Sequence, residues 1–301
     1  MTRAVEFVSD GVRLSGVLRV PDGAGPFPGV VLTGPLSGVK EQVAGLYAEK
    51  LAAAGFATLA FDHRNFGASA GEPRQHEDPH GKLHDLRDAV SFLRSQPEVD
   101  RDRIGCVGVC LGGGYALRAA AFDPRICALA TVAGGYNDPR GMQAGMGDGY
   151  RSLLTAQLEA TEDAVGPAYL NAVDGGPHDG TVMQGEEPAA YYGTERSASP
   201  GWVNQLTAAS IYELVTVDLG GAGDFISPTP WLMVHGEADD YCTPDQARAA
   251  FARAGSPKRD VWLPAKLHID LYDVPEYVGP AVAEITTWFR EHLSGPSGTT
   301  W

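Results

Sequence analysis

A short glycine-rich stretch between an apolar run and a helical run constrains this chain more than any other feature. Residues 104–109 are apolar and indicate a buried strand, and residues 115–122 have the composition of a helix. Between them lies Gly108-Val109-Cys110-Leu111-Gly112, which fits the strand–turn–helix pattern Gly-x-nucleophile-x-Gly. The two glycines leave room for strand and helix at a sharp turn. The pattern therefore predicts that Cys110 projects from the edge of a sheet.

The predicted position of Cys110 suits a reactive thiol. At the N-terminus of a helix, unpaired backbone N–H groups and the helix dipole favour negative charge, and hence the thiolate. The alternative is that Cys110 is a small buried residue beside a glycine-rich turn, since free cysteines are often buried. The flanking strand and helix, together with an acid and a histidine further along the chain, favour the reactive thiol.

Strand-like and helix-like segments alternate along most of the chain. An Asp10-Gly11 turn indicates an initial hairpin over residues 4–20. The alternation that follows predicts an α/β fold with a mostly parallel sheet and helices on both faces. Strands are expected at residues 29–33, 57–61, 104–109, 126–132, 230–236 and 259–263, and helices at 40–54, 83–93, 115–122, 245–254 and 276–293.

The alternation stops over residues 136–228. This segment is rich in Gly, Pro, Met, Tyr and acidic residues, has helical patches at 152–164 and 202–215, and shows no clear strand pattern. It is much longer than an ordinary connection. We expect a helical lid insertion within a single domain of residues 1–301, above the strand ends where open α/β sheets bind ligands. A helical insertion without substrate contact is the alternative. The small, polar tail at 294–300 is expected to lack regular structure.

An acid and a histidine follow the last two predicted strands. Asp239 comes three residues after Gly236, and His268 follows the final strand. These positions fit the chain order nucleophile, acid, base, and parallel strands bring them to one edge of the sheet. The histidine would take the thiol proton, and the acid would orient the imidazole. The spacing favours Asp239, and Asp240 remains the alternative acid.

Charge and composition narrow the possible partners. The formal net charge of −15 argues against nucleic acid and anionic membranes. No apolar run reaches the length of a membrane span, and residues 1–11 lack a signal-peptide core. A cytoplasmic location is therefore expected. The four cysteines show no CxxC or Cys/His metal spacing. We expect no disulfide, no metal and no organic cofactor.

Five short segments together carry a family resemblance. They are Gly38-Val39-Lys40-Glu41-Gln42, Asp62-His63-Arg64, Gly108-Val109-Cys110, Ser199-Pro200-Gly201-Trp202 and His268-Ile269-Asp270-Leu271-Tyr272-Asp273. With them the chain resembles the α/β-hydrolase superfamily, and within it a dienelactone hydrolase-like group that includes fungal polyketide transferases. The resemblance implies the α/β-hydrolase fold and a Cys-His-Asp triad of Cys110, His268 and Asp239. It also implies hydrolysis or transfer of an acyl group from a small-molecule ester, lactone or thioester, whether free or carrier-bound.

The expected oxyanion hole departs from the family pattern. In this fold one donor is the N–H after the nucleophile, here Leu111, and the other comes from the loop after the third strand. Relatives commonly carry His-Gly there, whereas this chain has Thr33-Gly34-Pro35-Leu36. Pro35 has no N–H, so Leu36 is the expected second donor. Losing one donor costs about 2.7–4 kcal/mol of barrier. A ligand-binding or cyclase-like protein without completed acyl transfer is therefore the alternative function.

Aromatic residues of the 136–228 segment are candidates for substrate contact. Tyr191, Tyr192 and Trp202 are expected to touch the acyl chain, and packing within the segment is the alternative for all three. Outside that segment, Asp62-His63-Arg64 is expected to be structural, with Arg64 paired with loop carboxylates and His63 at the mouth of the site. Neither the substrate nor the oligomeric state follows from the sequence.

Overall fold

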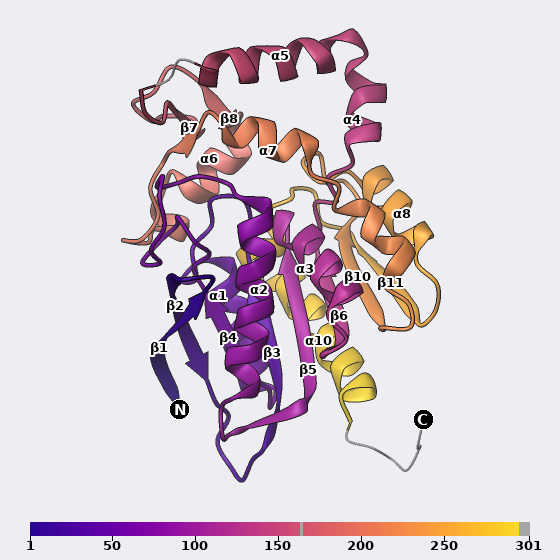
Figure 1. Ribbon diagram of the computed structural model, residues 1–301. Helices are drawn as coiled ribbons and strands as arrows, with labels where there is room; N and C mark the ends of the chain where they lie inside the picture. The colour runs from indigo at the N-terminus through magenta and orange to yellow at the C-terminus, as the bar shows by residue number, and fades with distance from the viewer. Residues whose placement is uncertain (163–164, 295–301) are drawn as a thin grey trace.

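The computed structural model of the chain describes residues 1–162 and 165–294 (Figure 1). Its centre is an eight-stranded sheet in the order β1-β2-β4-β3-β5-β6-β10-β11. The β1–β2 and β2–β4 pairs are antiparallel and the others are parallel, which confirms the predicted mostly parallel sheet. The strands are β1 (Thr2–Ser9), β2 (Val12–Arg19), β3 (Phe27–Thr33), β4 (Ala57–Phe61), β5 (Val99–Val109), β6 (Ile126–Val132), β10 (Trp231–Gly236) and β11 (Lys258–Leu263).

Helices cover both faces of this sheet, as predicted (Figure 1). In β3, Val31 faces one cluster of core residues, and its neighbours Val30 and Leu32 face the other. This alternation is expected of a strand buried on both sides. Helices α2, α3 and α8 pack into the Val31 cluster, and α1 and α10 into the other. These helices are α1 (Val43–Ala53), α2 (Pro79–Arg94), α3 (Leu111–Phe122), α8 (Pro244–Arg253) and α10 (Pro275–His292).

Side-chain caps set the start of two of these helices. The Asp78 carboxylate accepts from the backbone N–H of Gly81 at 2.8 Å at the start of α2. Thr243 caps α8 in the same way. Each cap is followed by a proline at the first helical position, where its missing N–H costs nothing. Because α8 cannot begin before Pro244, residues 237–243 form the turn that follows β10.

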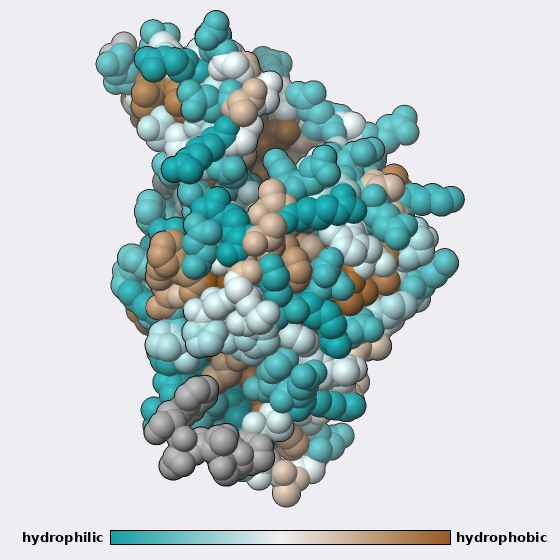
Figure 2. Space-filling model, turned by 90° about the vertical axis from the view of Figure 1, so that its right-hand side faces the viewer, coloured by the Kyte–Doolittle hydropathy of each residue, from teal (hydrophilic) through white to brown (hydrophobic). Residues whose placement is uncertain are grey.

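The edge strand β11 carries charged side chains. Lys258, Arg259 and Asp260 lie along it, and such residues discourage pairing with a second sheet. Figure 2 views the molecule from the right-hand side of Figure 1 and shows mostly hydrophilic residues there, with apolar ones in small groups. Among residues 1–162 and 165–294, no helix combines the length and apolar character needed to cross a membrane.

The segment between β6 and β10 lies above the end of the sheet where α3 begins (Figure 1). The expectation that it holds no strand is wrong, because β7, β8 and β9 form a small sheet in the order β8-β7-β9. These strands are only two to five residues long, too short to show a hydrophobic period. The segment comprises α4 (Pro139–Met146), α5 (Asp148–Glu162), β7 (Tyr169–Val173), β8 (Thr181–Met183), α6 (Glu186–Tyr192), η1 (Glu195–Ser197), β9 (Leu206–Thr207), α7 (Ser210–Thr216) and η2 (Gly220–Phe225).

The helical patches expected in this segment differ from the observed helices at their ends. The patch at 152–164 corresponds to α5, which begins at Asp148, and residues 163–164 lie outside the described residues. The patch at 202–215 is helical only from Ser210, because the chain before it pairs as β9. The tail expected at 294–300 lies outside the described residues except for Ser294.

Candidate active site

Cys110 lies at the sharp turn between β5 and α3. Its backbone has φ 55° and ψ −129°, a conformation that residues with a side chain rarely adopt. The Cys110 carbonyl accepts from the N–H groups of Gly113 and Gly135, each at 2.7 Å, and these bonds hold the turn. A Cβ on Gly108 would lie 2.2 Å from the Gly112 carbonyl oxygen. The predicted strand–turn–helix, and the need for glycine in it, are therefore confirmed.

The structure brings Asp239 and His268 together. Asp239 lies in the turn after β10 and is buried, and its Oδ1 accepts from the N–H groups of Tyr241 at 2.9 Å and Cys242 at 2.8 Å. Its Oδ2 lies 2.6 Å from His268 Nδ1. The neighbouring Asp240 is exposed. Of the two acids that the sequence left open, Asp239 therefore contacts the imidazole.

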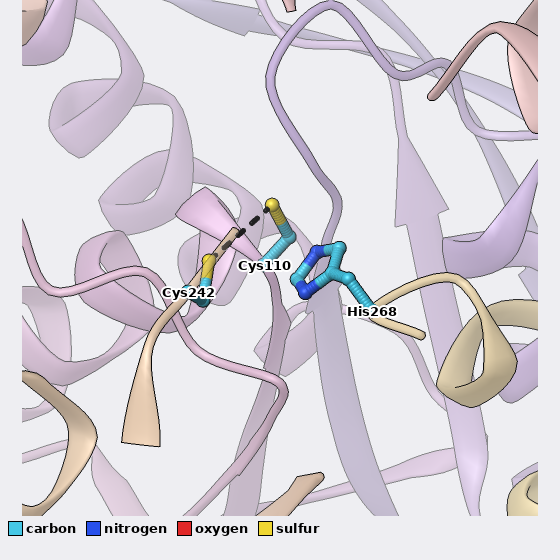
Figure 3. Close-up of side chains that lie close together, drawn as sticks. All are labelled: Cys110, Cys242 and His268. Atoms are coloured by element: carbon cyan, nitrogen blue, oxygen red, sulfur yellow. Dashed lines mark hydrogen bonds between the residues drawn. The ribbon is translucent and has the colours of Figure 1, made fainter. Parts of the chain in front are cut away.

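The other nitrogen of His268 faces the Cys110 region. Nε2 lies 3.0 Å from the hydroxyl of Tyr272, which is on the short helix α9 (Asp270–Asp273). Figure 3 shows Cys110 between His268 and Cys242. The sulfur atoms of Cys110 and Cys242 are 4.0 Å apart. The three residues come from separate elements: the β5–α3 turn, the turn after β10 and the loop before α9.

The same three side chains are the one group of three or more potential metal ligands found among residues 1–162 and 165–294. One donor atom of each of Cys110, Cys242 and His268 lies within 4.8 Å of the others. Because Asp239 contacts Nδ1 of His268, Nε2 is the imidazole nitrogen left to bind an ion. Two thiols and one imidazole are ligands that soft cations prefer.

The electrostatics of the site favour a charged thiol–imidazole pair. The pKa of Cys110 is held well below its usual range, most strongly by the hydrogen bond from the Cys242 thiol, and also by the charge of His268. Burial lowers the pKa of His268, but the Cys110 charge and the Asp239 carboxylate outweigh it and raise that pKa to about 10. Contact with Cys110 raises the pKa of Cys242. Both shifts favour the Cys110 thiolate paired with the His268 imidazolium.

A mostly apolar cavity of about 390 Å³ opens onto these residues. Cys110 and His268 line it. Among its described lining residues there is no lysine or arginine, and Glu187 carries the one carboxylate. Glu187 Oε1 accepts from the Ile269 N–H at 3.0 Å, which holds it beside the loop of His268. The apolar residues that line the cavity include Leu36, Leu111, Met142, Val182, Met183 and Leu214.

The three aromatic residues expected to contact substrate occupy different places. Tyr192 lines the cavity, and Tyr191 and Trp202 are not among the residues that line it. Trp202 stacks on Tyr192 with ring centroids 5.4 Å apart. Tyr191 packs edge-on against Tyr192 at 4.8 Å and against Tyr272 at 4.9 Å. These two residues therefore support the wall that Tyr192 forms.

The two expected oxyanion donors both line the cavity with Cys110. Leu111 is the first residue of α3, so its N–H has no partner within the helix. Leu36 lies in a turn closed by a hydrogen bond from the Gly38 N–H to the Pro35 carbonyl at 3.1 Å, and this bond does not use the Leu36 N–H. The loop lies close to the elbow, since a Cβ on Gly112 would be 2.5 Å from the Gly34 carbonyl oxygen.

Of the two expectations about Arg64 and His63, the second is wrong. Arg64 pairs with Asp85 of α2 at 3.0 Å and 2.8 Å, and it also lies 4.0 Å from the carboxylate of Asp78, in the loop before α2. His63 is buried rather than at the mouth of the site, with Nε2 2.8 Å from Thr33 Oγ1. Because His63 is buried and Arg64 pairs with Asp85, these residues have a structural role.

Sequence reasoning missed Cys242 and Tyr272 as members of the site. Each had a local signal, because Cys242 follows Asp239 by three residues and Tyr272 follows His268 by four. Residues in the same turn, or one helical turn apart, share a direction. Applied to Asp239 and His268, this rule would have placed both residues near the site, but it does not predict that the Cys242 sulfur contacts Cys110.

Comparison with known proteins agrees with this architecture. The family model described as the dienelactone hydrolase family matches residues 14–173. The chain is 34% identical to PA2218 of Pseudomonas aeruginosa, over 94% of this chain and 78% of that protein. It is 31% identical to the polyketide transferase ATR5 of Stachybotrys chlorohalonatus, over 90% and 91% of the two chains. It is 30% identical to the thiohydrolase aneE of Aspergillus aculeatus, over 85% of this chain and 82% of that protein.

Solved structures give the same fold. The match to the crystal structure of PA2218 covers 97% of this chain and 94% of the PA2218 chain, with a TM-score of 0.85 and 32% identity. The α/β hydrolase GrgF from Penicillium sp. sh18 covers 97% and 99%, with a TM-score of 0.77 and 24% identity. The α/β-hydrolase fold expected from the sequence is therefore confirmed.

Proposed function

Because the chain belongs to the dienelactone hydrolase family of α/β hydrolases, we propose that it is an acyl hydrolase or acyltransferase in which Cys110 forms an acyl-enzyme. One observation carries the proposal. The buried Asp239 carboxylate lies 2.6 Å from His268 Nδ1, and the imidazole so oriented lies beside the thiol of Cys110 at a helix N-terminus. This is the arrangement that activates a cysteine nucleophile.

The first half of the reaction forms the acyl-enzyme. The Cys110 thiolate attacks the substrate carbonyl carbon, and the carbonyl electron pair moves to oxygen. The N–H groups of Leu111 and Leu36 stabilise that oxyanion. When the tetrahedral intermediate collapses, the bond to the leaving alcohol or thiol breaks, and the His268 imidazolium protonates the leaving group.

The second half transfers the acyl group onward. Neutral His268 takes a proton from water or from an acceptor alcohol, whose oxygen attacks the thioester carbonyl. Collapse of the second intermediate releases the acid or the new ester and restores the Cys110 thiolate. Throughout, Asp239 holds the imidazole and stabilises its positive charge. Water and alcohol use the same machinery, so hydrolysis and transfer differ only in the acceptor.

The cavity favours an uncharged, apolar acyl group. Its lining is mostly apolar, and Glu187, the one carboxylate among the described lining residues, disfavours an anionic substrate in a site of low dielectric. A polyketide transferase and a thiohydrolase are among the relatives, which supports an ester or thioester as substrate. Such a substrate can be presented as a free small molecule or on a carrier.

The 136–228 segment acts in this proposal as a lid over the acyl site. Met142, Met183, Tyr192 and Leu214 belong to it and line the cavity. They are contributed by α4, β8, α6 and α7, so much of the segment takes part in the wall. Enclosure by these side chains would exclude water from the acyl chain.

A substrate series tests the proposal. We expect turnover of p-nitrophenyl esters and acyl thioesters with medium, uncharged acyl chains, and much weaker turnover of acyl chains that end in a carboxylate. Adding an alcohol acceptor should divert part of the product from acid to ester. The Cys110→Ala variant is the control. If neither esters nor thioesters react and the protein only binds them, the ligand-binding alternative is favoured.

A further inference from the structure

Cys110 has a second cysteine as its neighbour. The sulfur atoms of Cys110 and Cys242 lie 4.0 Å apart, although 132 residues separate them in the chain (Figure 3). Both residues line the apolar cavity. The other two cysteines have different surroundings. Cys106 is fully buried in β5, and the Cys127 thiol donates to the backbone carbonyl of Asp102 at 3.4 Å.

Backbone hydrogen bonds hold the two thiols in place. The Cys242 N–H donates to Asp239 at 2.8 Å, and its carbonyl accepts from His235 Nε2 at 2.7 Å. Cys110 is fixed by its own turn. A disulfide has an S–S distance of about 2.05 Å, so the sulfurs need to approach by about 2 Å.

We propose that Cys242 is a resolving thiol and that a hydroperoxide converts Cys110 and Cys242 into a reversible disulfide. The Cys110 thiolate attacks the peroxide O–O bond, an S–O bond forms, and hydroxide or alkoxide leaves to give the sulfenic acid. The Cys242 sulfur then attacks the Cys110 sulfur. The S–S bond forms, the S–O bond breaks, and the Cys242 proton leaves with the oxygen as water. Two thiols lose two electrons, and one peroxide gains them.

The chemistry of the two thiols fits this order of events. Cys110 lines the cavity and is partly accessible, and its contacts with Cys242 and His268 lower its pKa; a lowered pKa and access are the features of thiols that react with peroxides. Cys242 is buried, and its hydrogen bond to Cys110, its burial and the Cys110 charge beside it hold its pKa well above the usual range. Oxidation of Cys110 removes that charge. The resolving thiol is thus inactive before the first step and becomes easier to ionise after it.

The disulfide would protect the nucleophile from irreversible oxidation. A sulfenic acid without a nearby thiol is oxidised further to sulfinic and sulfonic acid. A disulfide instead returns to two thiols in the presence of a reductant. Formation of the bond requires no acyl transfer. The accompanying loss of acyl transfer rests on the proposed function.

Peroxide treatment followed by mass spectrometry tests the proposal. The reduced full-length protein, kept with a chelator so that no metal occupies the thiols, is treated with hydrogen peroxide at increasing ratios. We expect the intact mass to fall by two hydrogen atoms, and non-reducing peptide maps to link the Cys110 and Cys242 peptides. Cys242→Ser should instead gain two or three oxygen atoms on Cys110. Cys127→Ser, the matched control, should form the same link as the wild type.

Activity provides a separate readout. Dithiothreitol should restore hydrolysis to peroxide-treated wild type and not to treated Cys242→Ser. Accumulation of sulfinic acid on wild-type Cys110 without any Cys110–Cys242 peptide would overturn the proposal. That measurement on the wild type decides the question even if the serine variant does not fold. If the untreated protein has no acyl transfer activity, the proposed function fails while the peptide map still tests the disulfide.

Discussion

Asp239 Oδ2 lies 2.6 Å from His268 Nδ1, although 29 residues separate the two in the chain. The carboxylate is buried and takes two further hydrogen bonds from backbone N–H groups, so its position is fixed. This contact distinguishes Asp239 from its exposed neighbour Asp240. Asp239 therefore orients the imidazole of His268, although Asp239 is not among the described residues that line the cavity.

Asp239→Asn should therefore impair turnover far more than Asp240→Asn. The amide cannot stabilise the imidazolium charge, and a comparable change in a Ser-His-Asp triad lowers kcat about 10⁴-fold. Steady-state kinetics on one ester decide the matter. Wild-type kinetics in Asp239→Asn, together with a defect in Asp240→Asn, would reverse the assignment.

Cys110→Ala and His268→Ala should each reduce turnover by about 10⁴-fold or more, and the double variant should be little worse than either. The two side chains act as one unit, so removing the second one lowers the turnover rate little further. Thermal unfolding of Cys110→Ala should remain near that of the wild type, because the thiol lines a cavity and its loss leaves no closed void. Losses that multiply fully in the double variant would show that the residues work independently.

The β5–α3 turn could be predicted because its chemistry is local. Gly108 and Gly112 are required by carbonyl groups and side chains within a few residues or in the adjacent strand, so a five-residue pattern captures them. The start of α3 at Leu111 rather than residue 115 was harder to predict. Gly112, Gly113 and Gly114 disfavour helix, and packing against β6 and η2 overrides that preference.

The partner of the nucleophile could not be predicted from the sequence. The sequence around Cys242 does not indicate that its sulfur lies beside the sulfur of Cys110, which comes 132 residues earlier. That contact depends on how β6 and β10 pair in the sheet. The strands β7, β8 and β9 were missed for a related reason. These strands are stabilised by pairing with one another, as Leu170 of β7 pairs with Leu206 of β9. Their own sequences show no hydrophobic period.

Gly112→Ala should impair catalysis through the oxyanion hole. Its Cβ would lie 2.5 Å and 2.6 Å from the carbonyl oxygens of Gly34 and Thr33, so the loop that carries Leu36 has to move. Removal of one oxyanion donor costs about 10²–10³ in kcat, and we expect a loss of that order. Gly149→Ala is the matched control, because its Cβ meets nothing within 4 Å. An unchanged kcat in folded Gly112→Ala would show that the loop carrying Leu36 does not take part in catalysis.

Alkylation by iodoacetamide should select Cys110 and persist below pH 7. The pKa of Cys110 is held below its usual range, so the reactive thiolate remains as the pH falls, whereas burial raises the pKa of Cys106 to about 12. In His268→Ala the imidazolium is gone, the pKa of Cys110 rises, and reactivity at pH 6.5 should fall. Peptide mass spectrometry gives the rate at each cysteine. Equal labelling of Cys110 and Cys242 at pH 6.5 would argue against an activated thiolate.

The most direct test of the acyl-enzyme is its detection. The protein is mixed with an activated ester of an uncharged acyl chain, quenched in acid within the first turnover, and measured by intact and peptide mass spectrometry. We predict one acyl group per chain, attached to the Cys110 peptide, and none on Cys110→Ala. An acyl group on another residue, or turnover of the ester with Cys110 never modified, would contradict the proposed nucleophile.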